Sequence, residues 1–201
     1  MPLINRGFRR RQAEPPPGAR LPPGQHLVGD FPVLSAGPTP RIAPEDWELS
    51  IEGAVANPRR LGWEDFLALT GESIRRDIHC VTSWSKLDTG WEGVSVDTLL
   101  AGVEPRGAFA VIHSYGGYTT NLTLDDVTGG KAWVAHAYEG MPLAPQHGGP
   151  ARLLVPHLYF WKSAKWIHRI VVTEQNEPGF WETLGYHDRG DPWREQRYQG
   201  D

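Results

Sequence analysis

The lone cysteine, Cys80, is the residue in this chain whose type best suits chemistry. It stands in the run Asp77-Ile78-His79-Cys80-Val81-Thr82-Ser83-Trp84-Ser85, where a predicted strand ends beside a loop. A single cysteine excludes an intrachain disulfide and any Cys-rich zinc or iron–sulfur site. Two interpretations stay open: a buried small apolar residue, the commonest fate of a free cysteine, or a thiolate that attacks a substrate or binds a soft metal. Since neighbouring strand residues point to opposite faces, we do not expect His79 to form a dyad with Cys80.

A second segment combines a rigid loop with an isolated arginine. Residues 140–150 are rich in glycine and proline, and Arg152 follows them at the start of an apolar strand. The planar guanidinium of Arg152 suits a phosphate, and His147 could add a hydrogen-bond donor. The alternative is a structural loop that ends in a solvated arginine.

A third segment places two of the four lysines of the chain among aromatic residues. Lys162 and Lys165 lie in Tyr159-Phe160-Trp161-Lys162-Ser163-Ala164-Lys165-Trp166-Ile167. Either their stems lie on tryptophan rings with the ammonium groups in water, or they join backbone N–H groups in a compact pocket for an anion. The residue types alone leave both open.

The elements that must position these residues are predicted to form a mixed α+β domain, mostly β, with short helices. The apolar patterns predict short helices at 63–69 and at 95–101, the latter capped by Ser95. Residues 84–91 are predicted to be an irregular aromatic segment whose rings could wall a pocket, as could those of the C-terminal segment. The predicted strands are 47–53, 73–80, 108–113, 118–122, 131–138, 152–155 and 166–173.

Length and composition limit the possible domain organisation and cellular location. The 201 residues fit one folded domain at 26–201, preceded by a flexible, proline-rich arm at 1–25. A formal charge of −4 argues against a nucleic-acid partner. No apolar run is long enough for a transmembrane segment, and the arginines at 9–11 are followed by no apolar stretch of an export signal. We therefore expect a cytoplasmic protein.

Several enzyme classes lose support because their signatures are missing. The sequence has no Gly-x-Ser-x-Gly elbow, His-Glu-x-x-His helix, Walker loop or Gly-x-Gly-x-x-Gly turn, and its eight histidines show no metal-ligand spacing. Hydrolase, kinase and nicotinamide-dehydrogenase functions are disfavoured.

Taken together and in order, the three segments resemble the molybdopterin-binding domain of the sulfite oxidase superfamily. The resemblance is carried by Cys-Val-x-x-Trp-Ser at 80–85, Pro-Leu-x-x-x-His-Gly-x-Pro-x-Arg at 142–152, and Val-Pro…Lys-x-x-Lys-Trp-Ile at 155–167. It runs from about Phe31 to the end of the chain. It is strongest toward the short bacterial branch and the catalytic subunit of protein-methionine-sulfoxide reductase.

The resemblance implies a molybdenum–molybdopterin cofactor (Mo-MPT), with Cys80 as the catalytic metal ligand. The residues it assigns to the rest of the cofactor, whose phosphate needs an anion pocket, are His147, Arg152, Lys162, Ser163, Ala164 and Lys165. A further contact stretch falls on Pro32, Val33, Leu34 and Ser35, where the apolar side chains of this sequence offer only backbone groups. Ser114 aligns near another contact.

The resemblance also bears on substrate and partners. Sulfite oxidases follow the metal-binding cysteine with Gly-Asn-Arg-Arg, whereas Val81-Thr82-Ser83-Trp84 here shows no dianion pocket, although Arg189 or Arg194 could add positive charge. We therefore expect oxygen-atom transfer with a neutral, small-molecule or peptidyl S-oxide or N-oxide to be easier than sulfite oxidation. No Cys-x-x-Cys-His haem motif exists, so a separate electron-transfer partner is expected. Two alternatives remain, a non-catalytic molybdopterin-binding module or carrier and a plain β-rich interaction domain.

Overall fold

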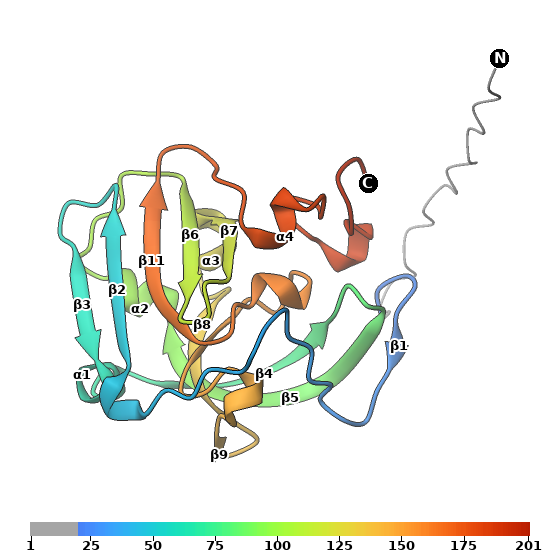
Figure 1. Ribbon diagram of the computed structural model, residues 1–201, viewed down its shortest axis with the longest axis horizontal. Coiled ribbons are helices and arrows are strands. Elements are labelled where there is room, and N and C mark those ends of the chain that lie inside the picture. The colour runs from blue at the N-terminus through green and yellow to red at the C-terminus, as the bar shows by residue number, and fades with distance from the viewer. Residues whose placement is uncertain (1–19) are drawn as a thin grey trace.

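Two β-sheets form the framework of the protein (Figure 1). The computed structural model describes residues 20–201, so most of the predicted arm, residues 1–19, lies outside the described residues. One sheet has six strands and the other has five, and the helices are short. The prediction of an α+β domain, mostly β, is confirmed.

The six-stranded sheet supplies the strand that ends at Cys80. Its strands are β1 (His26–Leu27), β4 (Glu72–His79), β5 (Trp84–Ser95), β8 (Trp133–Tyr138), β9 (Met141–Pro142) and β10 (Arg152–Leu154). Along the order β1-β5-β8-β10, β1 is parallel to β5 and the other pairs are antiparallel; β4 also pairs with β5, and β9 with β8. Cys80 therefore lies at the turn between two long paired strands, β4 and β5.

The prediction of an irregular segment at 84–91 is wrong, because these residues form the first part of β5. The strand pattern was hidden by Lys86, Asp88 and Gly90, which interrupt the alternation of apolar residues. Asp88 has φ 55°, and the register between β4 and β5 shifts near Arg76. A bulged strand of this kind does not show a period of two.

The five-stranded sheet has the order β3-β2-β11-β6-β7. Its strands are β2 (Glu48–Gly53), β3 (Arg59–Gly62), β6 (Phe109–Ser114), β7 (Thr119–Thr123) and β11 (Ile167–Thr173). β2 and β11 run parallel and the other pairs are antiparallel. Leu49 and Ile51 of β2 are buried while their neighbours are half-buried, which is the predicted alternation.

Short helices close the ends of the strands. The α-helices are α1 (Trp63–Leu67), α2 (Val96–Leu100), α3 (Leu124–Val127) and α4 (Phe180–Thr183). The 3-10 helices are η1 (Pro44–Asp46), η2 (Pro145–His147), η3 (Phe160–Lys162) and η4 (Pro192–Arg194). The Ser95 side chain accepts a hydrogen bond from the Thr98 N–H at 3.2 Å, so the predicted cap of α2 is confirmed.

The main core lies between the two sheets. Ile51 and Ile170 of one sheet belong to the same buried cluster as Val134 and Leu153 of the other. A second cluster surrounds the end of β4 and includes Cys80, Trp84, Trp91 and Phe160. Burial of these apolar side chains is the main favourable term that fixes β4, β5 and β10 around the cysteine.

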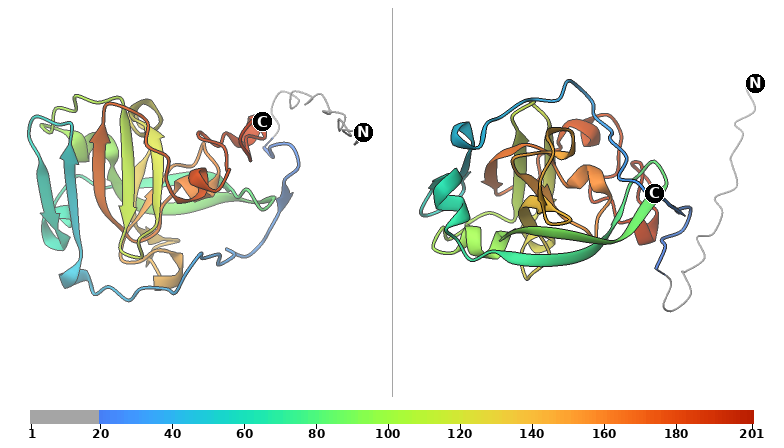
Figure 2. Two further views of the ribbon diagram at one scale, coloured as in Figure 1. Left: turned by 45° about the horizontal axis from the view of Figure 1, so that its top comes forward. Right: turned by 90° about the horizontal axis from the view of Figure 1, so that it is seen from below.

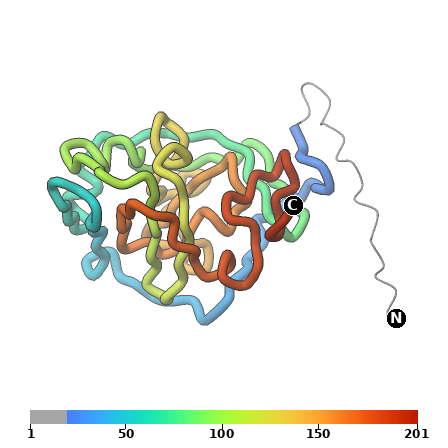
Figure 3. Tube along the Cα trace, turned by 90° about the horizontal axis from the view of Figure 1, so that it is seen from above, coloured from blue at the N-terminus to red at the C-terminus, as the bar shows by residue number. Residues whose placement is uncertain are grey.

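Two segments without long helices or strands complete the surroundings of Cys80. Residues 28–43 run from β1 to η1 along one side of the molecule (Figure 2). The C-terminal segment, which follows β11, lies beside the turn between β4 and β5 (Figure 3), where Arg197 donates a hydrogen bond to the Val81 carbonyl. Arg20, at the end of the predicted arm, forms ion pairs with Asp77 and Asp88 on β4 and β5.

Candidate functional site

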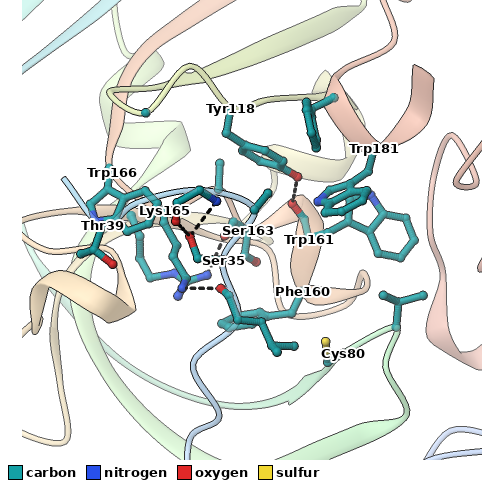
Figure 4. Close-up of a pocket in the computed structure, with 18 of the residues that line it drawn as sticks. Ser35, Thr39, Cys80, Tyr118, Phe160, Trp161, Ser163, Lys165, Trp166 and Trp181 are labelled. Carbon is teal, nitrogen blue, oxygen red and sulfur yellow. Dashed lines mark hydrogen bonds between the residues drawn. The ribbon is translucent and has the colours of Figure 1, made fainter. Parts of the chain in front are cut away.

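A cavity of about 750 Å³ opens between the 28–43 segment, the Cys80 turn, η3 and the C-terminal segment. Figure 4 shows Cys80 and Lys165 separated across this cavity. Arg152 and Lys165 are the charged residues that line it among those the structure describes. The cavity therefore joins a cationic part to a part that holds a buried thiol.

Arg152 is a buried cation without a carboxylate partner in the described chain. Its guanidinium donates to the backbone carbonyl oxygens of His147 at 2.8 Å and Ser163 at 2.6 Å. Burial lowers the pKa of Arg152 to about 9, which leaves it charged at neutral pH. The guanidinium also lies over the Phe160 ring, 4.2 Å from its centroid. A buried cation that meets carbonyl dipoles and a ring, with no carboxylate to balance it, suits an anion.

Lys165 adds a second positive charge to the same part of the cavity. Its ammonium group donates to the carbonyl oxygens of Leu34 and Gln146, both at 2.7 Å. Burial, and then the charge of Arg152, lower the pKa of Lys165 to about 8. Each cation destabilises the other, so an anion between them would relieve the repulsion.

The loop before Arg152 needs a glycine at the point where the side chains of Arg152 and Lys165 pack against it. Gly148 has φ 109°, and a Cβ on it would lie 3.0 Å from the Cβ atoms of both Arg152 and Lys165. Gly148 and Gly149, whose Cβ would lie 2.0 Å from the Leu143 carbonyl oxygen, thus have a packing reason, whereas a Cβ on Gly140 would meet nothing within 4 Å.

Backbone N–H groups complete the cationic part. The N–H groups of Ala164 and Lys165 have no hydrogen-bond partner within residues 20–201, whereas the Ser163 N–H donates to the Phe160 carbonyl at 3.1 Å. The Ser163 hydroxyl accepts from the Val155 N–H. The free amides therefore belong to Ala164 and Lys165, one residue later than the expected pair Ser163–Ala164. Two adjacent free amides beside two cations suit a phosphate.

Cys80 is buried, with 7% of its surface exposed, and its thiol lines the cavity. The Thr82 hydroxyl donates to Sγ at 3.2 Å, and the Gln25 amide donates to the Cys80 carbonyl at 3.1 Å. Burial raises the pKa of the thiol, against the opposing effects of the Thr82 hydrogen bond and the Arg197 charge. A buried thiol suits a soft metal that would hold it as the thiolate.

His79 points away from the Cys80 thiol. Its Nδ1 lies 2.8 Å from the Ser85 hydroxyl, and its ring packs against Trp193. Burial lowers the pKa of His79 to about 4, so the ring is neutral at pH 7. This arrangement agrees with the expectation that no Cys–His dyad forms.

The 28–43 segment brings Pro32, Leu34 and Ser35 to the cavity. Val33 is not among the lining residues, and half of its surface is exposed. Phe31 lines the cavity and stacks on the His147 ring, with centroids 4.1 Å apart.

Three other predicted residues do not line the cavity. The His147 Nδ1 and the Ser114 hydroxyl are buried without a hydrogen-bond partner in the described chain. Lys162 is fully buried and points instead to Glu182, with Nζ 2.6 Å from Oε1, and to the Asn121 carbonyl. The geometry supports a phosphate contact for Arg152 and Lys165 but gives none to Lys162.

The positive charge near Cys80 comes from a residue that the sequence analysis did not single out. Arg189 pairs with Asp126 at 3.1 Å, and Arg194 is exposed and outside the cavity. Arg197 instead binds the Val81 carbonyl and lies over the Tyr159 ring at 5.0 Å. No local pattern marked Arg197, because its role depends on a contact between residues far apart in sequence.

Aromatic residues line the rest of the cavity. Of the rings in 84–91, Trp84 lines it and Trp91 does not. The C-terminal segment contributes rings, as predicted. The turn before β7 adds another ring, and the helix η3 adds two more, which the sequence did not predict. The lining rings outside 84–91 are Phe31, Tyr118, Phe160, Trp161, Trp166, Phe180, Trp181 and Tyr186.

Two further findings concern metals and membranes. Within residues 20–201, no cluster of three or more His, Cys, Asp or Glu side chains is placed to hold a metal ion. A metal at Cys80 would therefore need most of its donors from a bound group. Of the described helices, none has the length and hydropathy required to cross a membrane.

The sequence matches known proteins over most of its length. Residues 36–181 match the family described as the oxidoreductase molybdopterin binding domain. The chain is 46% identical to the uncharacterized oxidoreductase YuiH of Bacillus subtilis, over 90% of this chain and 93% of that protein. It is 30% identical to the protein-methionine-sulfoxide reductase catalytic subunit MsrP of Pseudomonas syringae, over 79% of this chain but only 52% of MsrP.

A solved structure has the same fold. The crystal structure of the sulfane dehydrogenase SoxCD from Paracoccus pantotrophus superposes with a TM-score of 0.62 and 20% sequence identity. The match covers 69% of this chain and 41% of the SoxCD chain. The sheets described above are therefore an arrangement already known from an experimental structure.

Proposed function

The chain belongs to the oxidoreductase molybdopterin binding domain family, and from this premise we propose that it transfers an oxygen atom at a molybdenum ion bound by Cys80. It is a molybdopterin-dependent enzyme, and its cofactor is Mo-MPT. One observation carries the proposal: a single cavity joins the cations Arg152 and Lys165 to the buried Cys80 thiol. A phosphate-bearing group with a metal at its other end fits both.

The residues of this chain would divide the work of holding the cofactor. Arg152, Lys165 and the free amides of Ala164 and Lys165 would bind its phosphate. Leu34 and Ser35 would cover it on the side of the 28–43 segment. The bound cofactor would supply a metal that cycles between oxidised and reduced states beside the substrate.

Cys80 would supply the protein's own ligand to the metal. Its backbone is held on both sides, since its N–H donates to the Trp84 carbonyl at 2.8 Å and its carbonyl accepts from Gln25. The thiol belongs to a cluster of buried apolar side chains that includes Trp84 and Phe160. A thiolate ligand held in a fixed position is what a metal site requires of its protein.

We propose reduction of a neutral S-oxide or N-oxide as the reaction. Among residues 20–201, Arg152 and Lys165 are the charged residues that line the cavity, and both lie in its cationic part. A small dianion such as sulfite would lose its hydration in the rest of the cavity without paired positive charge. A neutral oxide has no net charge to be paired, and the lining outside the cationic part is mostly aromatic and aliphatic. The similarity to MsrP supports an S-oxide.

The reaction balances with a separate electron donor. The S–O or N–O bond of the oxide breaks, the oxygen leaves as water with two protons, and two electrons enter from a reduced partner protein. Small and peptidyl oxides both fit this chemistry. A non-catalytic carrier has no observation in its favour, and a cytoplasmic location stays a prediction from the sequence.

The proposal is tested on one molybdenum-loaded sample. Sulfoxide-dependent oxidation of a reduced viologen is compared with sulfite-dependent reduction of a dye. We expect turnover with the sulfoxide and little with sulfite. Efficient sulfite turnover without sulfoxide activity would overturn the proposed substrate.

A further inference from the structure

Five aromatic rings line the part of the cavity away from Lys165. We call them the aromatic wall: Tyr118, Trp161, Phe180, Trp181 and Tyr186. Ring centroids are 5.3 Å apart for Trp161–Tyr186, 5.0 Å for Trp181–Tyr186 and 6.0 Å for Tyr118–Phe180. Figure 4 shows Tyr118, Trp161 and Trp181 grouped on one side, with Lys165 on the other. The contacts form a continuous surface from three separate segments of the chain.

Two rings of the wall use their polar atoms within the protein. The Tyr118 hydroxyl donates to the Trp161 carbonyl at 2.6 Å, and the Trp161 N–H donates to Glu182 Oε1 at 2.9 Å. Their ring surfaces, not their polar atoms, are left for the cavity. An apolar surface of this kind is solvated poorly and gains from contact with another apolar group.

A buried ion pair fixes the wall. Glu182 Oε1 accepts from Trp161 and from the Thr120 hydroxyl at 2.9 Å, and it lies 2.6 Å from the Lys162 ammonium. Glu182 belongs to α4, which also carries Phe180 and Trp181. The pair therefore ties the rings of α4 to the ring on η3, and the wall has a defined shape before a substrate arrives.

The wall lies close to the thiol. The backbone N–H of His187, next to Tyr186, donates to the Arg197 carbonyl at 3.1 Å, and Arg197 in turn binds the Val81 carbonyl beside Cys80. Cys80, Val81 and Thr82 line the same cavity as the aromatic wall. A substituent held by the wall would belong to a substrate whose oxide lies near Cys80.

Resting on the proposed oxide reduction, we propose that the aromatic wall is the subsite for an apolar, ring-sized substituent of the substrate. An alkyl aryl sulfoxide has such a substituent, whereas dimethyl sulfoxide leaves the rings in contact with water. One methylene in an apolar pocket typically changes specificity by about tenfold or more. We therefore expect kcat/KM for methyl phenyl sulfoxide to exceed that for dimethyl sulfoxide by at least about tenfold.

The test compares both sulfoxides in molybdenum-loaded protein. Trp181→Ala should remove most of the preference for methyl phenyl sulfoxide, and Trp181→Phe, which keeps a ring, should retain it. Tyr198→Ala is the matched control, because Tyr198 packs on Tyr186 at 5.4 Å, is 55% exposed and does not line the cavity. It should leave the preference unchanged.

Binding of the product sulfides separates this inference from the proposed function. If neither sulfoxide is reduced, the oxide chemistry is wrong, but calorimetry of methyl phenyl sulfide and dimethyl sulfide with the loaded protein still tests the wall. We expect the phenyl compound to bind at least about tenfold more tightly, and Trp181→Ala to abolish the difference. Equal binding of the two sulfides, or an unchanged preference in Trp181→Ala, would overturn the subsite.

Discussion

At the scale of single residues, the surroundings of Cys80 differ from those of a buried core cysteine. Its sulfur accepts a hydrogen bond from Thr82, and Arg197 binds the next carbonyl along the chain. Both contacts favour negative charge on or near the sulfur. An apolar core offers no such partners, so these contacts fit a thiolate ligand better than a packing role.

The Thr82 hydroxyl should tune the bound metal. A hydrogen bond to a ligand sulfur withdraws electron density and stabilises the reduced metal. Thr82→Val should therefore lower the reduction potential, by about 59 mV if the oxidised-to-reduced ratio changes tenfold in a one-electron couple. Redox titration followed by electron paramagnetic resonance measures it.

Two controls distinguish tuning by Thr82 from a change in packing. Thr82→Ser keeps a hydroxyl and should keep the wild-type potential. Thr128→Val removes a hydroxyl that donates to the Leu124 carbonyl outside the cavity, and it should have no effect. A wild-type potential in Thr82→Val would show that the contact with Sγ has no electronic role.

Lys165 should contribute to cofactor retention through the phosphate. Charge-assisted hydrogen bonds of this kind are worth about 1.5–3 kcal/mol. Lys165→Gln should therefore weaken retention of the pterin roughly tenfold or more, measured by pterin fluorescence after dialysis and denaturation. Lys131→Gln, which removes an exposed ammonium that bonds the Asp125 carbonyl, is the matched control and should retain the cofactor. Full retention in Lys165→Gln would mean that this ammonium only holds the 28–43 segment, through the Leu34 carbonyl.

The same lysine gives a pH dependence in protein without cofactor. The pKa of Lys165 is lowered to about 8, so the ammonium loses its charge as the pH rises through that value. Binding of sulfate, whose own charge is constant there, should weaken between pH 7 and 9 by up to about tenfold per pH unit. Sulfate-dependent thermal stabilisation measures it, and in Lys165→Gln it should be weaker and nearly flat from pH 7 to 8, because the pKa of Arg152 is about 9.

At the scale of elements, the sequence could predict strands with regular alternation and helices with clear caps. β2 alternates, and Ser95 marks the start of α2. β5 was missed because a bulge, where Leu87 and Asp88 face Asp77 of β4, breaks its period. The glycine-rich loop before Arg152 could be predicted, since residue types alone reveal its turns.

The site could be predicted only where a local pattern existed. Cys80, Arg152 and Lys165 carry motifs of this kind, and all three line the cavity. Arg197 and the partnership of Lys162 with Glu182 could not be predicted, because each depends on tertiary contacts between distant segments. A lysine among aromatic residues looks the same in sequence whether it faces a phosphate or a buried carboxylate.

The Lys162–Glu182 pair should contribute to the stability of the fold and not to binding of the cofactor phosphate. Removing one partner of a buried ion pair typically costs about 3–5 kcal/mol, because the other charge stays buried. Lys162→Met should lower the free energy of unfolding by about that amount, measured by urea denaturation. The double variant Lys162→Met/Glu182→Gln should regain part of the loss. A stable Lys162→Met protein that fails to retain pterin would instead indicate a phosphate ligand.

At the scale of the whole molecule, the two sheets place distant segments around one cavity. The 28–43 segment, the β4–β5 turn, η3 and the C-terminal segment each contribute lining residues. The shared core fixes the strands, whereas the lining comes mostly from loops and short helices. This division allows the lining to vary while the fold is retained, and the fold is shared with SoxCD at only 20% identity.

The most direct test of the account is X-ray absorption at the molybdenum edge, which counts the sulfur ligands of the metal. Protein made with the cofactor available should contain about one molybdenum per chain, as a single thiolate ligand requires. Cys80→Ser should retain pterin, because Arg152 and Lys165 are unchanged, but its molybdenum should have one sulfur ligand fewer and no redox activity. The same sulfur count in both proteins, or no molybdenum and no pterin in the wild-type chain, would contradict the account.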